Sequence, residues 1–434
     1  MKATRREFVA LAAAWASLPA WAQTAAASAP SGRWPWENDK GRATPHVMVR
    51  RLHLDIAGRL PRVDEARAYV QSKDKDRRAR LVDALLASED FADYWSMRLC
   101  DLLRVKSEFP INLWPNAVYV YHRRIREAVL RDEPLDAFAA SLVTASGSDF
   151  RDAEANFTRA TNDRSPEGIA RTAVRTFFDE DLAAWPEDRR AAAVAAFEGV
   201  QVKTTREWKE EIVCCSGVDR RAEFAALVTG SMRGRFAAAF AGYVAYWMFG
   251  RRGADAALGE RFLKGGCRLK PLVRAIVLSD EYAAGAVTGG FPLRRLDAEV
   301  LDDALCSLTG SKRSFSSIAP EPFTFLPPER KSVLIEDGSI SSAFLTLFGR
   351  PPRDSGLPEE RGSVITAKQR HYLFNSGSLY QRLGRIKGKY QDLYWKFLSR
   401  PPTADERAVL DAAKPSLRDL AWCLLNSREF LYRS

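Results

Sequence analysis

The fold is decided by the stretch at residues 54–61, which reads Leu54-Asp55-Ile56-Ala57-Gly58-Arg59-Leu60-Pro61. An apolar helical segment stops there at a glycine and a proline, two residues that commonly end helices. Turns of the same kind recur at 250–253, 349–352 and 399–402, each after an apolar segment. The recurrence predicts a helical unit that the chain uses more than once.

A serine follows each of these turns at a similar interval: Ser88, Ser279, Ser376 and Ser427. Apolar residues with the spacing of one helix face precede the serine. We therefore expect the turn to end one helix, a second helix to pack on the core, and the serine to cap a third. Acidic residues next to the serine suit the positive end of that third helix. The alternative is a chance likeness among the turns of a helical protein.

Long alternating strand patterns are absent from the sequence, which predicts an all-α fold. We expect multi-helix domains built from repeated helical hairpins, with no substantial sheet, and the irregular intervals between copies exclude a solenoid. The expected divisions are a signal peptide at 1–22, a flexible linker at 23–44, an N-terminal helical domain at 45–160, a middle helical region at 161–310, a Ser/Pro-rich linker at 311–330 and a C-terminal helical domain at 331–434.

The amino-terminal residues have the order of a signal peptide. Arg5 and Arg6 precede an apolar, alanine-rich run, and Ala20-Trp21-Ala22 offers the small residues that signal peptidase reads. Paired arginines favour the twin-arginine route over the general secretory route and place the mature protein in the periplasm or at the cell surface. The apolar run is too short to span a bilayer, so we expect cleavage and no transmembrane anchor afterwards. A retained amino-terminal anchor is the alternative.

The composition predicts a folded chain with a basic surface. Hydrophobic residues make up 46% of the chain and aromatic residues 11%, and the formal net charge is +11. Lys and Arg are interspersed with Asp and Glu, so we interpret the excess charge as a solvated basic surface. An anionic polysaccharide would suit such a surface, and nucleic acid is not expected as the partner of an exported protein.

Cysteine and histidine form no recognisable metal or cofactor motif. The six cysteines are too sparse for a disulfide framework and mostly lie in apolar surroundings that indicate buried thiols. Cys214 and Cys215 are adjacent, a spacing that fits neither a redox pair nor a zinc knuckle. No two histidines have the spacing that places two ligands on one helix face, so we expect no histidine-built metal site and no cofactor.

Longer motifs resemble a known family. Residues 54–61, followed by Arg80-Leu81-Val82-Asp83-Ala84-Leu85-Leu86-Ala87-Ser88 and Tyr94-Trp95, are similar to the opening of domain of unknown function 1549. Residues 331–434 resemble its usual companion, domain 1553, on three motifs: Leu373-Phe374-Asn375-Ser376, Leu398-Ser399-Arg400-Pro401-Pro402-Thr403 and Leu424-Leu425-Asn426-Ser427-Arg428-Glu429-Phe430.

The resemblance implies a planctomycete-type exported protein that acts beside an exported sulfatase-like partner. Many members carry c-type cytochrome modules or a Cys-x-x-Cys-His haem motif. That motif occurs nowhere in this chain, so covalent haem is not carried over. The family also supplies no catalytic residues that can be mapped onto these positions.

A candidate site lies within residues 101–124, where polar and aromatic residues mix in a way that helix interiors rarely contain. Pro110 and Pro115 must break the helix and hold Asn112 and Trp114 on a loop that can face a ligand. The candidate ligand or partner residues are Asp101, Arg104, Lys106, Glu108, Asn112, Trp114, Asn116, Tyr119, His122 and Arg123.

Two further expectations concern this stretch. His122 precedes two arginines on an expected helix, where it could titrate near neutrality beside an anion. The alternative to a site is that Trp114 and Tyr119 are core aromatics, while Arg104 and Glu108 form an i, i+4 pair on a solvated helix.

Two functions of different classes follow from these patterns. The first is a binding or accessory protein that docks an exported partner enzyme or an anionic extracellular polymer, because the sequence shows helical hairpins, excess positive charge and no catalytic motif. The second is a periplasmic enzyme, a hydrolase, whose site is assembled from residues distant in sequence.

Changing Arg5 and Arg6 to Lys should leave the precursor in the cytoplasm, because lysine does not reproduce the planar guanidinium pair that the twin-arginine translocon reads. Fractionation of cells expressing the tagged precursor measures this. Unchanged export of the variant, or export that stops when only the general secretory channel is blocked, would contradict the expected route.

Overall fold

The computed structural model describes residues 41–251, 256–286, 290–317, 319 and 324–433. The predicted signal peptide and the predicted linker up to residue 40 lie outside these residues. The described part of the first region forms α3 Pro45–Ala57, α4 Val63–Gln71, α5 Arg77–Leu86, α6 Glu89–Leu102, α7 Pro115–Leu130 and α8 Leu135–Thr144, with a short helical turn η1 at Ala153–Ala155 and α9 Asn156–Arg159.

The middle region continues the helical pattern. Its helices are α10 Pro166–Phe178, α11 Glu187–Ala195, α12 Arg221–Ala226, α13 Arg233–Phe249, α14 Ala256–Lys264, α15 Leu269–Leu278, α16 Asp280–Ala283 and α17 Ala298–Thr309, with the turns η2 Leu182–Ala184 and η3 Leu227–Ser231. The C-terminal helices are α18 Ala343–Leu347, α19 Ala367–Asn375, α20 Gly377–Leu383, α21 Tyr390–Leu398, α22 Ala404–Ala413, α23 Leu417–Leu425 and α24 Arg428–Leu431, with the turns η4 Ser332–Leu334 and η5 Pro358–Glu360.

Strands are few and short, so the all-α prediction is confirmed. A three-stranded antiparallel sheet has the order β1 (Gly147–Ser148), β3 (Glu211–Cys215), β2 (Val200–Thr204), with Gly147 and Val202 both opposite Val213. A second pair joins β4 (Arg294–Arg295) to β5 (Tyr432–Arg433). The β2–β3 hairpin is a departure from the all-helical expectation.

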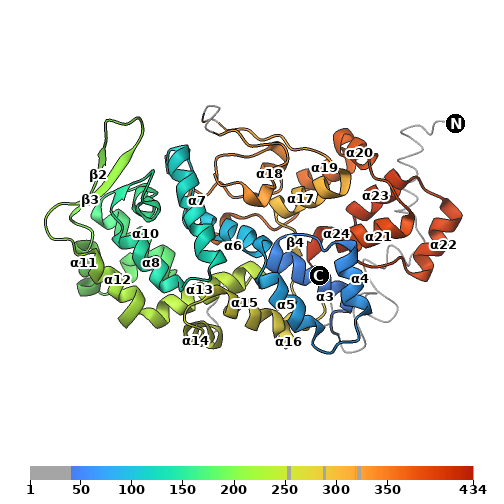
Figure 1. The fold of residues 1–434 in the computed structure, drawn as a ribbon, viewed down its shortest axis with the longest axis horizontal. Helices are drawn as coiled ribbons and strands as arrows, with labels where there is room; N and C mark the ends of the chain where they lie inside the picture. The colour runs from blue at the N-terminus through green and yellow to red at the C-terminus, as the bar shows by residue number, and fades with distance from the viewer. Residues whose placement is uncertain (1–40, 252–255, 287–289, 318, 320–323, 434) are drawn as a thin grey trace.

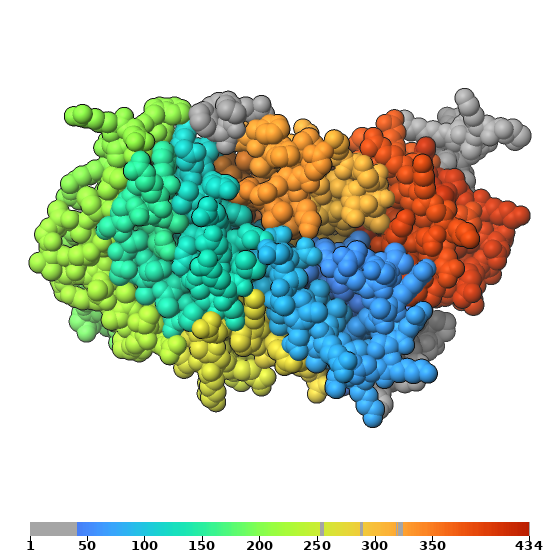
Figure 2. Space-filling model, viewed as in Figure 1, coloured from blue at the N-terminus to red at the C-terminus, as the bar shows by residue number. Residues whose placement is uncertain are grey.

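Helix α3 lies between the yellow helices of the middle region and the red C-terminal helices (Figure 1), and Figure 2 shows the blue N-terminal residues in contact with both. Arg50 donates to the carbonyl oxygens of Phe397 at 2.8 Å and Phe430 at 2.7 Å, near the ends of α21 and α24. The next residue, Arg51, donates to the carbonyls of Tyr282 and Ala284 at the end of α16. The buried side chains of all three regions form one hydrophobic cluster, and the predicted boundaries between them stay predictions.

The repeated turns end helices as the sequence predicts. Gly58, Gly250 and Ser399 close α3, α13 and α21 in the left-handed conformation, with φ of 60°, 71° and 60°. Gly349 has φ of 78° one residue after the C-cap of α18. This conformation strains residues that have a side chain, which explains why three of the four copies use glycine.

The four serines cap helices, which confirms the second half of the unit. Ser88, Ser279, Ser376 and Ser427 each accept a hydrogen bond from the backbone N–H three residues on, at 3.2 or 3.3 Å. The residues that donate are fully buried or nearly so, namely Phe91, Tyr282, Leu379 and Phe430. The cap therefore fixes where the anchoring side chain of the third helix enters the core.

In each repeated turn an arginine follows the left-handed residue. In the first and last copies its ion pairs, which were not expected from the sequence, connect the turn to the helices that follow it. Arg59 binds Glu65 of α4 at 2.8 Å and Asp90, two residues after the capping serine, at 2.6 Å. In the last copy Arg400 binds Glu406 at 2.7 Å and Glu429 at 2.8 Å, in the same relative positions.

The other two copies show which residue decides the pairing. Arg251 pairs with Glu281, again two residues after the serine. The third copy has Ser378 there, and its arginine, Arg350, instead lies 3.3 Å from the buried Glu299.

A buried ion network joins α6 and α17 to the loop after α18. Asp101 accepts hydrogen bonds from Arg353 at 2.9 Å and Arg361 at 2.6 Å, and Arg361 also binds Glu299 at 2.5 Å. Burial alone would raise the pKa of Asp101, but the charges of Arg361 and Arg353 hold it below its usual value. Asp101, predicted as a ligand residue, therefore lies inside the protein and holds three segments together.

Many arginines lie inside the molecule, but the buried carboxylates nearly balance their charge, so the expected basic surface stays a prediction. Buried arginines bind carboxylates or the carbonyl oxygens at helix ends, where a cation offsets the negative end of the helix. They are Arg50, Arg51, Arg98, Arg104, Arg159, Arg221, Arg294, Arg295, Arg350, Arg353, Arg361 and Arg433.

Replacing Asp101 by Asn should lower the free energy of unfolding by about 3–5 kcal/mol, because it leaves two buried guanidinium groups short of negative charge. Urea unfolding followed by circular dichroism measures the loss. The control Asp83→Asn removes the half-exposed partner of Arg274 and should cost under about 1 kcal/mol. Equal losses in the two variants would contradict the role given to Asp101.

Candidate functional site

The loop between α6 and α7 contains the centre of the predicted site. Helix α6 ends at Leu102, where Val105 N–H bonds to the Cys100 carbonyl at 3.1 Å and Arg104 takes a left-handed φ of 56°. This is a helix end of the Schellman type with arginine in the position that usually holds glycine. Asn112 has φ of 58°, and α7 begins at Pro115, so the chain from 103 to 114 is a loop.

Part of the predicted site is buried and serves the fold. Arg104 is 5% exposed and donates to the carbonyls of Leu102 and Ala160 and to the hydroxyl of Thr176. Lys106 is 6% exposed and binds Asp354 at 2.5 Å. Arg104 and Glu108 are outside the helix and Arg104 is buried, so the alternative of a solvated i, i+4 pair is wrong.

Glu108 ties the loop to segments that come much later in the chain. Its backbone N–H donates to the Ser339 hydroxyl at 2.8 Å, and its carboxylate accepts from the Ser317 hydroxyl at 3.2 Å. The side chain is half-buried, so the loop keeps this carboxylate near its surface.

The remaining predicted residues lie on the outside. Asn112 is exposed on the loop, and Asn116, Tyr119 and Arg123 are exposed on α7, where spacings of three and four residues place them on one face. Tyr119 is 56% exposed, so it is not a core aromatic as the alternative supposed.

The structure adds a partner for Trp114 that the sequence analysis did not place. The β2–β3 hairpin rises beside α7 (Figure 1), and its tip carries Trp208, which is 62% exposed. The rings of Trp114 and Trp208 meet edge to face with centroids 4.4 Å apart. Lys209 Nζ lies 5.9 Å from the centroid of each ring, within the range of cation–π attraction. The short alternating pattern of Val200–Thr204 could have shown the hairpin.

Arg159 holds the hairpin and the loop in register. Its guanidinium donates to the carbonyls of Ile111 at 3.2 Å and Asn112 at 2.7 Å, and it forms an ion pair with Glu211 at the start of β3. Because Trp114 comes two residues after Asn112, this contact sets the approach of the two indoles. We call the resulting surface the α7 tip surface; its residues are Asn112, Trp114, Asn116, Tyr119, Trp208 and Lys209.

The hairpin next to this surface is cationic. Lys203, Arg206 and Lys209 are exposed on it, and the exposed Glu207 is 3.4 Å from Arg151. The other hairpin carboxylates are engaged: Glu210 accepts from the hydroxyls of Ser148 and Thr205 at 2.5 and 3.0 Å, and Glu211 pairs with Arg159. An anion approaching the two indoles therefore meets positive charge.

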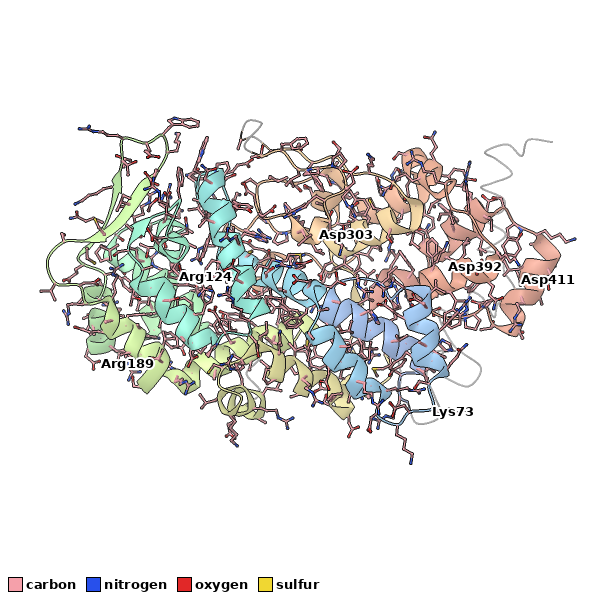
Figure 3. The ribbon with its side chains drawn as sticks, viewed as in Figure 1. Lys73, Arg124, Arg189, Asp303, Asp392 and Asp411 are labelled. Carbon is pink, nitrogen blue, oxygen red and sulfur yellow. The ribbon has the colours of Figure 1, made fainter. Side chains whose placement is uncertain are left out.

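A separate cavity of about 640 Å³, which shares no lining residue with this surface, lies between the first repeated turn and α17. Three aspartates line it: Asp90, Asp93 and Asp303, the last on α17 (Figure 3). Asp90 binds Arg59 and Lys331, Asp93 binds Arg126, and Asp303 binds Arg313. Burial raises the pKa of Asp303 to about 7 against the opposing charge of Arg313.

Cysteine and histidine are not grouped for metal binding in the part of the chain that the structure describes. There, no cluster of three or more His, Cys, Asp or Glu side chains is placed to hold an ion. Cys214 and Cys215 are partly exposed free thiols on β3, and Cys100, Cys267 and Cys306 are buried.

His122 is buried on the inner side of α7, which corrects the expectation that it titrates near neutrality. Burial, with the charges of Arg353, Arg330 and Arg126 around it, lowers its pKa from 6.5 to about 3. The folded protein therefore keeps a neutral imidazole at pH values where the unfolded chain takes up a proton.

Stability should consequently fall as the pH drops below about 6.5, by about 2 kcal/mol at pH 5 from this residue alone. The variant His122→Gln should lose that part of the pH dependence, whatever its stability at pH 7.5. Urea unfolding at pH 7.5, 6 and 5 measures it. The control is His371→Gln, an exposed position on α19, which should keep the wild-type dependence. Parallel curves for wild type and His122→Gln would show that His122 is not responsible.

Comparison with family models gives one match, at residues 37–206, to the family described as PSCyt2, protein of unknown function (DUF1549). No curated protein and no solved structure matches the chain. The matched stretch contains the repeated turn at Gly58 and the whole α6–α7 loop and ends at Arg206, two residues before Trp208. Residues 37–206 are thus similar to the DUF1549 family, as the sequence predicts, and the companion domain 1553 stays a prediction for residues 331–434.

Proposed function

We propose that the protein is an exported binding protein that holds an anionic extracellular polymer, of the acidic polysaccharide class, at the α7 tip surface. The observation that carries the proposal is the pair of indoles, Trp114 and Trp208, with the ammonium group of Lys209 near both rings. An indole face suits the apolar face of a sugar ring, and a cation beside it suits an acidic substituent.

The geometry favours a chain-like ligand. The surface is open, with Trp208 and Tyr119 more than half exposed, and the further cations Lys203 and Arg206 continue along the hairpin. A polymer can contact such positions one after another without an enclosed pocket. The cations would also make the affinity fall as salt concentration rises.

Hydrolysis, the alternative function, has less support at this surface. A glycosidic bond needs two carboxyl groups that can act on the substrate. Glu210 and Glu211 are bound to other side chains, and Glu207 is beside Arg151. In the cavity the carboxyl groups are likewise engaged by Arg or Lys side chains. Binding therefore explains more of the described residues than catalysis does.

Export by the twin-arginine route and a sulfatase-like partner complete the proposal. The first rests on Arg5 and Arg6, and the second on the resemblance to the family. No helix among the described residues has the length and apolar character needed to cross a membrane. The partner would act on the same polymer that the α7 tip surface holds.

The variants Trp208→Ala and Lys209→Ala should each weaken binding of polygalacturonate about tenfold or more, which corresponds to about 1.4 kcal/mol, without changing the melting temperature. Isothermal titration with the mature protein measures the affinity. Wild-type binding should weaken in high salt, and neutral dextran should not compete.

Matched controls are Phe374→Ala, another half-exposed aromatic, and Lys368→Ala, another exposed lysine, both on α19. Arg104→Gln and Asn112→Ala are poor probes, because Arg104 is buried and alanine tolerates the left-handed backbone of residue 112 less well than asparagine does, a difference that does not arise between lysine and alanine at residue 209. Wild-type affinity in Trp208→Ala, or equal loss in the α19 controls, would refute the proposed surface. Release of reducing sugar from the polymer would favour the hydrolase.

A further inference from the structure

The cavity beside the first repeated turn has the properties of a binding site for a small molecule. Its volume of about 640 Å³ is within the range of ligand pockets. The turn 58–63, the first turn of α6, the end of α17 and Lys396 of α21 all line it, so segments far apart in the sequence meet there. A ligand in the cavity would contact the N-terminal, middle and C-terminal parts of the chain at once.

The charges of the cavity exclude a cation as its natural ligand. Asp90 lies between Arg59 at 2.6 Å and Lys331 at 3.0 Å. Asp303 is bound by Arg313 and by the backbone N–H groups of Ser332 and Val333 at 2.7 and 3.2 Å. A metal ion or an amine would have to displace these arginines and lysines, which already neutralise the carboxylates.

One lysine in the cavity wall has no carboxylate partner among the described residues. That lysine is Lys396, whereas the largely exposed Arg62, which also lines the cavity, is paired with Glu65 at 2.9 Å. Leu60, Pro61 and Val333 add apolar side chains to the lining. The wall thus offers an apolar surface and positive charge at its edge.

Two helices end at the cavity. The final turns of α3, up to Gly58, and of α17, up to Gly310, contribute to the lining. The last carbonyl groups of a helix have no helical N–H to bind, so they accept hydrogen bonds from other donors. Hydroxyl groups on a ligand would be suitable donors there.

We infer that the cavity binds a small hydroxylated organic anion of the sugar-acid class. The carboxylate or sulfate of the ligand faces Lys396, its ring packs on Leu60 and Pro61, and its hydroxyls donate to the helix ends. This inference is independent of the polymer at the α7 tip surface, since no residue is shared by the two sites.

The test uses the mature protein with glucuronate as probe and glucose as its neutral counterpart, measured by saturation-transfer NMR and by titration. Wild type should bind glucuronate at least about fivefold more tightly than glucose. Lys396→Met should remove that preference, and Ser307→Trp, which places an indole at an exposed position of the lining, should abolish binding of both sugars. Lys368→Met, on α19, is the control and should bind as wild type does.

Three results would overturn the inference: equal affinity of the wild type for the two sugars, no binding of glucuronate at about 50 mM, or unchanged binding in Ser307→Trp. Loss of folding in a variant is detected by its circular dichroism spectrum, and Lys396→Met, a partly exposed position, then carries the test alone. Trp208→Ala should keep glucuronate binding, and Ser307→Trp should keep polymer binding. Failure of one proposal is thereby distinguishable from failure of the other.

Discussion

The structure depends on buried guanidinium groups that satisfy backbone carbonyls at the ends of helices. A helix leaves its last carbonyls without partners and carries partial negative charge there, so an arginine that reaches the end gives both hydrogen bonds and charge balance. Arg50 does this for α21 and α24, and Arg294 does it for α13 through the carbonyls of Tyr246 and Trp247. Many short helices meeting in one core create many such ends, which makes arginine the residue that this core needs. Lysine could not replace it, because a single ammonium group lacks the planar fork that reaches two carbonyls.

The repeated unit applies the same chemistry at its turns. The left-handed residue ends a helix, the serine starts another, and the arginine between them closes the unit by binding an acid two residues after the serine. The third copy lacks that acid and uses its arginine in the core instead, next to Glu299. The unit therefore still forms when the acid after the serine is absent, provided that the arginine pairs with another carboxylate.

Local features of the fold could be predicted from the sequence, because they rest on residues close together in the chain. The helix ends at Gly58 and Gly250 follow from backbone preference, and the serine caps follow from side-chain hydrogen bonding over three residues. The loop at 103–114 follows from its prolines. Each of these features depends on a few residues that are adjacent in sequence.

The remaining features depend on distant partners and could not be predicted. Nothing near Arg104 in the sequence indicates that it lies against Ala160 and Thr176, and nothing near Trp114 indicates Trp208. His122 has an ordinary helical neighbourhood in sequence, but in the folded protein burial lowers its pKa, and the charges of Arg353 and Arg330 from distant segments lower it further. For the same reason composition alone does not tell a solvated arginine from a buried one that binds the end of a helix.

Strand β5 has a consequence for the order in which the chain can assemble. Arg433 pairs with Asp55 of α3 across 378 positions of sequence, and Tyr282 donates to the same carboxylate at 2.8 Å. While the chain is being synthesised, α3 leaves the ribosome long before Arg433, so a nascent chain holds Asp55 without its arginine until β5 has been made. A buried carboxylate without a cation opposes closure of the core. Closure of the core around Asp55 is therefore coupled to synthesis of β5, and a chain stopped before Tyr432 lacks the ion pair with Arg433.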